Sequence, residues 1–219
     1  MNIDYSLYVI LDWRVTQGRP LLEVAQAVVR GGATVLQLRE KQMLTTRDYV
    51  RIATELRAWA REAHVPFIVN DRVDVALEVD ADGVHLGPDD LSLKTARQIL
   101  GPGRIIGVSA GTVDEARAAE QGGADYIGVG AVYATSSKAD AGAPIGVDGF
   151  RVIAHAVRIP AVAIGGIRSE GTAALISAGA AGVAIISAIT SAPDAEQAAR
   201  EVSEQIRLAR RNSSKTPAG

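Results

Sequence analysis

Short apolar runs rich in Val, Ile and Leu alternate along this chain with longer segments of helical period. The runs are continuous and do not alternate with polar residues, which is typical of strands covered on both faces. They predict eight strands, near residues 8–11, 34–38, 66–70, 83–86, 104–109, 126–132, 160–165 and 183–188. Between them the pattern predicts helices with one apolar stripe, including one over 46–63 and a last one near 192–210.

Seven of these runs end in a polar cluster. The clusters are Gln37-Leu-Arg-Glu-Lys41, Asn70-Asp71, Asp89-Asp90, Ser109, Thr135-Ser-Ser-Lys138, Gly165-Gly166 and Ser187. In a parallel α/β barrel the carboxyl ends of all strands converge on one face, and that face carries the catalytic groups. The pattern therefore predicts an α/β protein with a single (β/α)8 TIM barrel and an active site at this face.

Length and composition agree with one soluble catalytic domain. A chain of 219 residues suits a single barrel, which we expect over residues 1–210, with a disordered tail over 211–219. A net charge of -2 argues against a nucleic-acid partner, and the absence of Cys excludes disulfides and thiolate chemistry. The first strand begins by about Tyr8 and no apolar run is long enough to span a bilayer, so we expect a cytoplasmic protein with no membrane partner.

Two carboxylates follow neighbouring predicted strands. Asp71 ends the third strand and Asp90 lies in the loop after the fourth. Carboxylates without Cys or clustered His suit Mg²⁺, which also shares substrate phosphate oxygens. The alternative is that these residues cap the helices that follow, because Asp is a favoured N-cap residue.

Cationic and phosphate-binding candidates lie at other strand ends. Gln37, Arg39 and Lys41 alternate and so point to one side, which indicates an anionic ligand or, equally, salt bridges to Glu40 or Asp71. Lys138 lies in the segment 133–146, which is rich in Gly, Ser, Thr and Ala and has the composition of a mobile lid or, alternatively, of a solvated flexible loop. The glycine pair before Ile167 and the Ile186-Ser187 pair occupy places where barrels hold a phosphate on backbone N–H groups.

The remaining chemistry-bearing residues give weaker signals. His64 and His155 are expected at the surface, and His85 is expected to be a hydrogen-bonded residue of the barrel wall. The aromatic positions are interpreted as packing.

The motifs taken together resemble one enzyme family. They are Gln37-Leu-Arg-Glu-Lys41, Val69-Asn-Asp71, Ala81-Asp-Gly-Val-His-Leu-Gly87 followed by Asp90, Gly107-Val-Ser109, Gly123-Ala-Asp-Tyr-Ile-Gly-Val-Gly130, Thr135-Ser-Ser-Lys138 and Ile164-Gly-Gly-Ile167. In this order and spacing they resemble the thiamine phosphate synthases. That family couples 4-amino-2-methyl-5-hydroxymethylpyrimidine diphosphate with 4-methyl-5-hydroxyethylthiazole phosphate, uses Mg²⁺ and releases diphosphate.

The resemblance implies roles for individual residues. Asp71 and Asp90 would hold Mg²⁺. Catalysis at the leaving diphosphate would fall to Arg39, Ser109 and Lys138, with a further diphosphate contact from Lys41. Gln37 and Asn70 would hold the pyrimidine. The thiazole phosphate would be bound by Thr135, Ser137, Gly166, Ile186 and Ser187.

The chain also departs from the family pattern. Gly111 stands where many members have a His two residues after the serine, and no second Lys follows Lys138. The first departure disfavours a thiazole tautomerase, the same-fold alternative, because glycine carries no proton. A catalytically silent binding relative is disfavoured because Asp71, Asp90, Ser109 and Lys138 are all present. The oligomeric state stays open, with a homo-oligomer among the alternatives.

Overall fold

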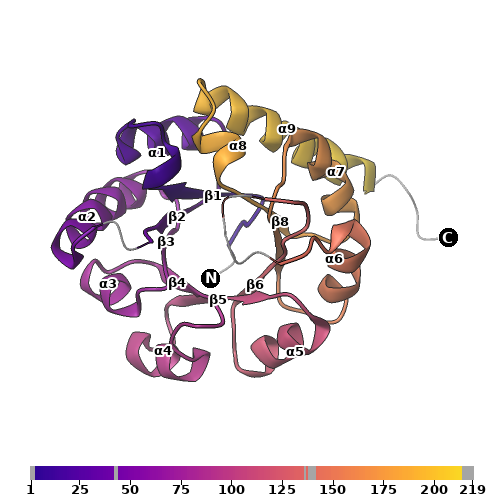
Figure 1. Ribbon diagram of the computed structural model, residues 1–219, viewed down its shortest axis with the longest axis horizontal. Coiled ribbons are helices and arrows are strands. Elements are labelled where there is room, and N and C mark those ends of the chain that lie inside the picture. Colours follow the sequence, from indigo (N-terminus) through magenta and orange to yellow (C-terminus); the bar gives the residue numbers. More distant parts are fainter. Residues whose placement is uncertain (1–2, 42–43, 136, 138–141, 214–219) are drawn as a thin grey trace.

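Eight parallel strands close into a barrel in sequence order, with β8 paired to β1 (Figure 1). The computed structural model describes residues 3–41, 44–135, 137 and 142–213. The strands are β1 (Leu7–Asp12), β2 (Val35–Arg39), β3 (Phe67–Asn70), β4 (Gly83–Leu86), β5 (Ile105–Ala110), β6 (Tyr126–Val129), β7 (Ala161–Ile164) and β8 (Gly182–Ile185). The predicted (β/α)8 barrel is confirmed.

Helices form a ring around the barrel (Figure 1). They are α1 (Leu21–Arg30), α2 (Thr46–Glu62), α3 (Val73–Glu78), α4 (Leu93–Leu100), α5 (Val113–Gln121), α6 (Gly146–Ala154), α7 (Ser169–Ser177), α8 (Ser187–Thr190) and α9 (Ala195–Ser213), with a 3₁₀ turn, η1 (Trp13–Val15), after β1. Over the described part of the chain, the helices are too short or too polar to cross a lipid bilayer.

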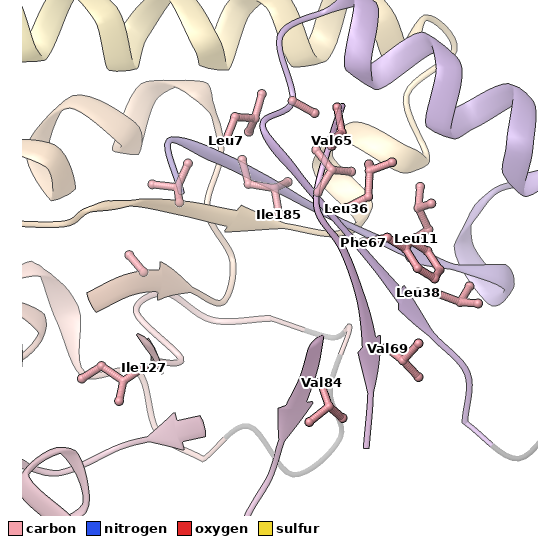
Figure 2. Close-up of a cluster of buried hydrophobic side chains, with 14 of the residues drawn as sticks. Leu7, Leu11, Leu36, Leu38, Val65, Phe67, Val69, Val84, Ile127 and Ile185 are labelled. Atoms are coloured by element: carbon pink, nitrogen blue, oxygen red, sulfur yellow. The ribbon is translucent and has the colours of Figure 1, made fainter. Parts of the chain in front are cut away.

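Alternate strand residues build two separate cores. Leu7, Val9 and Leu11 of β1 belong to the large cluster between strands and helices, part of which is drawn in Figure 2. Tyr8 and Ile10 belong to a smaller cluster inside the barrel. This division follows from the strand period, since successive side chains point to opposite faces.

The ends of three elements differ from the expected ones. β6 ends at Val129 and β8 at Ile185, earlier than residues 132 and 188. After β8 the chain turns at Ile186 (φ -107, ψ -98) into the short helix α8, which the apolar pattern had hidden. The last helix, α9, continues to Ser213, so residues 211–213 are helical and the expected tail boundary is wrong there. Arg210 and Arg211 in the last turn favour this extension, because cations stabilise a helix C-terminus.

Candidate active site

One cavity of about 990 Å³ opens at the carboxyl ends of the strands. It is lined by every described residue that the sequence predicted for the site: Gln37, Arg39, Lys41, Asn70, Asp71, Asp90, Ser109, Thr135, Ser137, Gly166, Ile186 and Ser187. Lys138 and part of the 133–146 segment lie outside the described residues. A smaller hollow of about 310 Å³ at the other end of the barrel is lined by arginines that are paired with Asp80 and Asp82.

Two carboxylates meet at one edge of this cavity. Asp71 follows β3 in a left-handed conformation (φ 63), and its N–H donates to the carbonyl oxygen of His85 in β4 (2.8 Å). The Asp90 carboxylate accepts from the Gly87 N–H (2.7 Å). Burial raises the pKa of Asp90, and interaction with the Asp71 carboxyl raises this pKa further. The backbone therefore holds two acidic groups close together.

The capping interpretation of these carboxylates is wrong. The residue before α3 is Arg72, and no side chain caps this helix. Helix α4 is capped by Ser92, whose hydroxyl accepts from the Thr95 N–H (3.2 Å). Asp71 and Asp90 therefore do not cap the helices that follow them.

The acidic pair fits a hard divalent cation that keeps ligands from outside the protein. Among the described residues, no three His, Asp or Glu side chains gather in a metal-binding group. Mg²⁺ commonly binds one or two carboxylates and completes its shell with water and phosphate oxygens. The raised pKa of Asp90 is also the expected state of an acidic pair before a cation neutralises it.

Both cations of β2 and its following loop are paired with carboxylates. Lys41 Nζ lies 2.5 Å from Asp71 Oδ2, which is one of the salt bridges that the sequence left open. Arg39 is paired with Asp12, which also accepts three hydrogen bonds from Arg14, one of them from its backbone N–H. Burial acts to raise the pKa of Asp12, but the Arg14 hydrogen bonds and the Arg39 charge outweigh it and lower this pKa. Both cations still line the cavity.

The sequence analysis did not predict Asp12 as a site residue, although its position in the chain carries a signal for one. It is the polar residue that ends the first apolar run, so the rule applied to the seven other strand ends also covers it.

Backbone groups and hydroxyls gather on the opposite side of the cavity. Ser137 Oγ lies 3.2 Å from Ser187 Oγ at the start of α8, and the Ser137 N–H donates to Thr135 Oγ1 (3.2 Å). Gly166 is left-handed (φ 65), and a Cβ there would collide with the Ala134 carbonyl. Glycine is therefore required for the chain to pass this close to the 133–135 loop.

Several polar side chains in the barrel interior are joined by hydrogen bonds. His85 Nε2 lies 3.1 Å from Ser109 Oγ, and His85 Nδ1 lies 3.0 Å from the Tyr126 hydroxyl. His85 is thus hydrogen-bonded, as predicted, while His64 and His155 are exposed. The sequence interpretation missed the polar role of Tyr8 and Tyr126, which it took as packing alone.

A family model described as thiamine monophosphate synthase matches residues 7–189. The chain belongs to this family. It is 51% identical to the thiamine-phosphate synthase of Moorella thermoacetica over 94% of this chain and 98% of that protein. It is 50% identical to the thiamine-phosphate synthase of Chloroflexus aurantiacus, over 91% and 92% of the two chains.

Among solved structures, a thiamine phosphate pyrophosphorylase from Pyrococcus furiosus matches with a TM-score of 0.86 and 40% identity. The match covers 94% of this chain and 97% of that one. Membership of the thiamine monophosphate synthase family makes the protein an enzyme, a transferase of thiamine biosynthesis that acts on small molecules.

Gly111, the departure from the pattern of many thiamine phosphate synthases, lies at the cavity lining. Its N–H donates to the Glu115 carboxylate (2.6 Å), and Glu115 also lines the cavity. The place of the missing histidine is therefore next to an acidic side chain from α5.

Proposed function

We propose that this protein joins 4-amino-2-methyl-5-hydroxymethylpyrimidine diphosphate to 4-methyl-5-hydroxyethylthiazole phosphate in the barrel-mouth cavity. One observation carries the proposal: cationic, acidic and hydroxyl side chains from well-separated strand ends line a single cavity large enough for both substrates. The products are thiamine phosphate and diphosphate.

The leaving diphosphate lies between Arg39, Lys41 and Ser109, and the family resemblance assigns Lys138 to the same ligand. Gln37 and Asn70, both nearly buried, hold the pyrimidine. The thiazole phosphate lies against Thr135, Ser137 and the backbone at Gly166, Ile186 and Ser187. The hydrogen bond between Ser137 and Ser187 supports this last site, because it joins the loop after β6 to the start of α8.

Asp71 and Asp90 would hold a magnesium ion, which would supply positive charge to neutralise the leaving diphosphate. The Asp71 carboxylate also holds Lys41 (2.5 Å), so the acidic pair and the anion-binding cations form one connected set. Such a set fits a diphosphate that is bound together with Mg²⁺.

The reaction needs no protein nucleophile. The bond between the methylene carbon and the diphosphate oxygen breaks, and its electron pair leaves with the diphosphate. The aminopyrimidine stabilises the resulting cation, and the lone pair of the thiazole nitrogen forms the new C–N bond. Arg39 and Lys138 stabilise the negative charge that grows on the departing group, which favours the transition state over the ground state.

We further propose that the reaction takes place in the cytoplasm. All the described site residues belong to one chain, so the site is compatible with a monomer or a homo-oligomer.

The test is to incubate the purified protein with both substrates and Mg²⁺ and to measure thiamine phosphate. We expect product that depends on both substrates and disappears with a chelator. Conversion of a thiazole tautomer without the pyrimidine would instead indicate a tautomerase. Binding of both substrates without turnover would indicate a silent relative.

A further inference from the structure

A chain of hydrogen bonds crosses the barrel interior between two parts of the active site. Gln37 Nε2 lies 2.8 Å from the Tyr8 hydroxyl, which lies 2.8 Å from the Tyr126 hydroxyl. The Tyr126 hydroxyl lies 3.0 Å from His85 Nδ1, and His85 Nε2 lies 3.1 Å from Ser109 Oγ. We name this series Gln37–Tyr8–Tyr126–His85–Ser109 the relay. All five of its residues line the cavity.

The relay lies within tightly packed surroundings that fix its geometry. Tyr8 and Tyr126 are each 1% exposed, and the Tyr5 ring packs against the Tyr126 ring in a tilted arrangement, at a centroid distance of 4.8 Å. A Cβ at Gly107 would collide with the Tyr126 ring, so glycine at this strand position makes room for the ring. A Cβ at Gly128 would lie 3.0 Å from Cε1 of the His85 ring, which is a milder close contact. The barrel interior is therefore shaped around these rings.

Each member of the relay has a limited number of protons to give. Burial raises the pKa of both tyrosines well above the ordinary range, so each hydroxyl keeps its single proton. A neutral imidazole also carries one N–H. The relay therefore has two self-consistent directions, with every proton pointing either toward Ser109 or toward Gln37.

The placement of Gln37 with its amide nitrogen toward the Tyr8 hydroxyl is consistent with the first direction. Its amide donates to Tyr8, so Tyr8 donates to Tyr126 and Tyr126 donates to His85 Nδ1. His85 then carries its proton on Nε2 and donates to Ser109 Oγ. The Ser109 proton is left for a ligand, as an anion requires. At the other end, the Gln37 carbonyl oxygen is left as an acceptor.

We propose that Tyr8, Tyr126 and His85 are positioning residues that couple anion binding at Ser109 to selection of an amino group at Gln37. This inference rests on the proposed function. A diphosphate oxygen at Ser109 favours the direction in which Ser109 donates. That direction holds the Gln37 carbonyl toward the pyrimidine, where it accepts from a 4-amino group and repels a 4-oxo group.

The experiment compares kcat/KM for the 4-amino pyrimidine diphosphate with kcat/KM for its 4-oxo analogue. The intrinsic reactivity of each substrate does not depend on the variant. A change in the ratio of the two kcat/KM values therefore reports a change in how the pocket recognises the pyrimidine. Tyr126→Phe interrupts the relay and lets the Gln37 amide rotate, with Tyr8 then donating to it. We expect the preference for the amino substrate to fall about tenfold, the size of one hydrogen bond.

Tyr8→Phe is the second variant, because it interrupts the relay at a different link. Tyr49→Phe is the matched control: its hydroxyl is buried and contacts the Leu38 carbonyl (3.3 Å), away from the cavity. A fall in the ratio for both relay variants but not for Tyr49→Phe supports the coupling.

Two results would overturn the relay alone: an unchanged ratio in active Tyr126→Phe and Tyr8→Phe proteins, or an equal fall in Tyr49→Phe. A wild-type protein that forms no thiamine phosphate would instead overturn the proposed function, and the relay with it. The two failures are therefore distinguishable.

Discussion

Asp12 and Arg39 are register partners at the ends of β1 and β2, and their side chains form an ion pair. Both side chains are nearly buried, at 2% and 9% exposure. Removing one partner of a buried pair leaves the other charge without compensation, which is the costly case. Asp12 therefore fixes the position of a guanidinium that we assign to diphosphate binding.

Asp12→Asn should lower the free energy of unfolding by about 3–5 kcal/mol, because Arg39 loses a charged partner. It should also raise KM for the pyrimidine diphosphate more than KM for the thiazole phosphate. Denaturant unfolding and steady-state kinetics measure the two effects. The control is Asp148→Asn, whose exposed pair with Arg151 (2.6 Å) should have no measurable effect on either quantity. A wild-type KM in Asp12→Asn would contradict the positioning role.

Asp71→Ala and Asp90→Ala should each reduce turnover by at least about 100-fold, since each removes a charge that we assign to the metal site. The fold should survive, because neither side chain fills the apolar core. Circular dichroism melting separates loss of structure from loss of chemistry. Asp114→Ala, on the exposed first turn of α5, is the control and should keep wild-type activity. Near-normal Mg²⁺-dependent turnover in either site variant would exclude the metal assignment.

The pKa of Asp90 should lie above that of an ordinary aspartate in the metal-free protein, because burial and the Asp71 carboxyl both raise it. The native state then binds this proton more tightly than the unfolded state does. Asp90 therefore contributes less to stability as the pH rises through its raised pKa. Magnesium affinity should change in the opposite sense and fall as the pH drops through the same pKa.

Carboxyl carbon chemical shifts, followed over pH, measure the Asp90 pKa directly. Asp71→Asn should lower this pKa, because it removes the neighbouring acidic group. An Asp90 pKa that is the same in Asp71→Asn as in the wild type would show that the two carboxylates do not interact.

Gly166→Ala should raise KM for the thiazole phosphate by about tenfold or more, because a Cβ at this left-handed position (φ 65) meets the Ala134 carbonyl and displaces the adjoining loop. KM for the pyrimidine diphosphate should change much less. The matched control is Gly103→Ala, where a Cβ meets no atom within 4 Å. Equal increases in the two KM values would indicate a general distortion of the barrel mouth.

Electron-withdrawing groups on the pyrimidine should slow the chemical step strongly, because they destabilise the cation that forms when diphosphate leaves. Single-turnover rates over a series of substituted pyrimidines measure this dependence, and diphosphate binding should stay nearly constant. A rate of bond breaking that does not respond to the substituents would rule out a dissociative step.

The sequence by itself determined the architecture and the location of the site. Continuous apolar runs specified strands buried on both faces, and their number and alternation with helices specified the closed barrel. Because all strands run the same way, polar residues at their ends had to meet at one face. That argument alone predicted the shared lining of residues as distant as Gln37 and Ser187.

Tertiary structure decided which partners these residues have. The pairing of Arg39 with Asp12 and of Lys41 with Asp71 depends on side-chain reach across neighbouring strands. Whether Asp90 caps a helix or faces Asp71 depends on loop geometry that strand and helix periods do not specify. The meeting of Tyr8 and Tyr126, 118 positions apart, depends on closure of the barrel. Periodicity says that a residue points inward; only the closed barrel determines what it meets there.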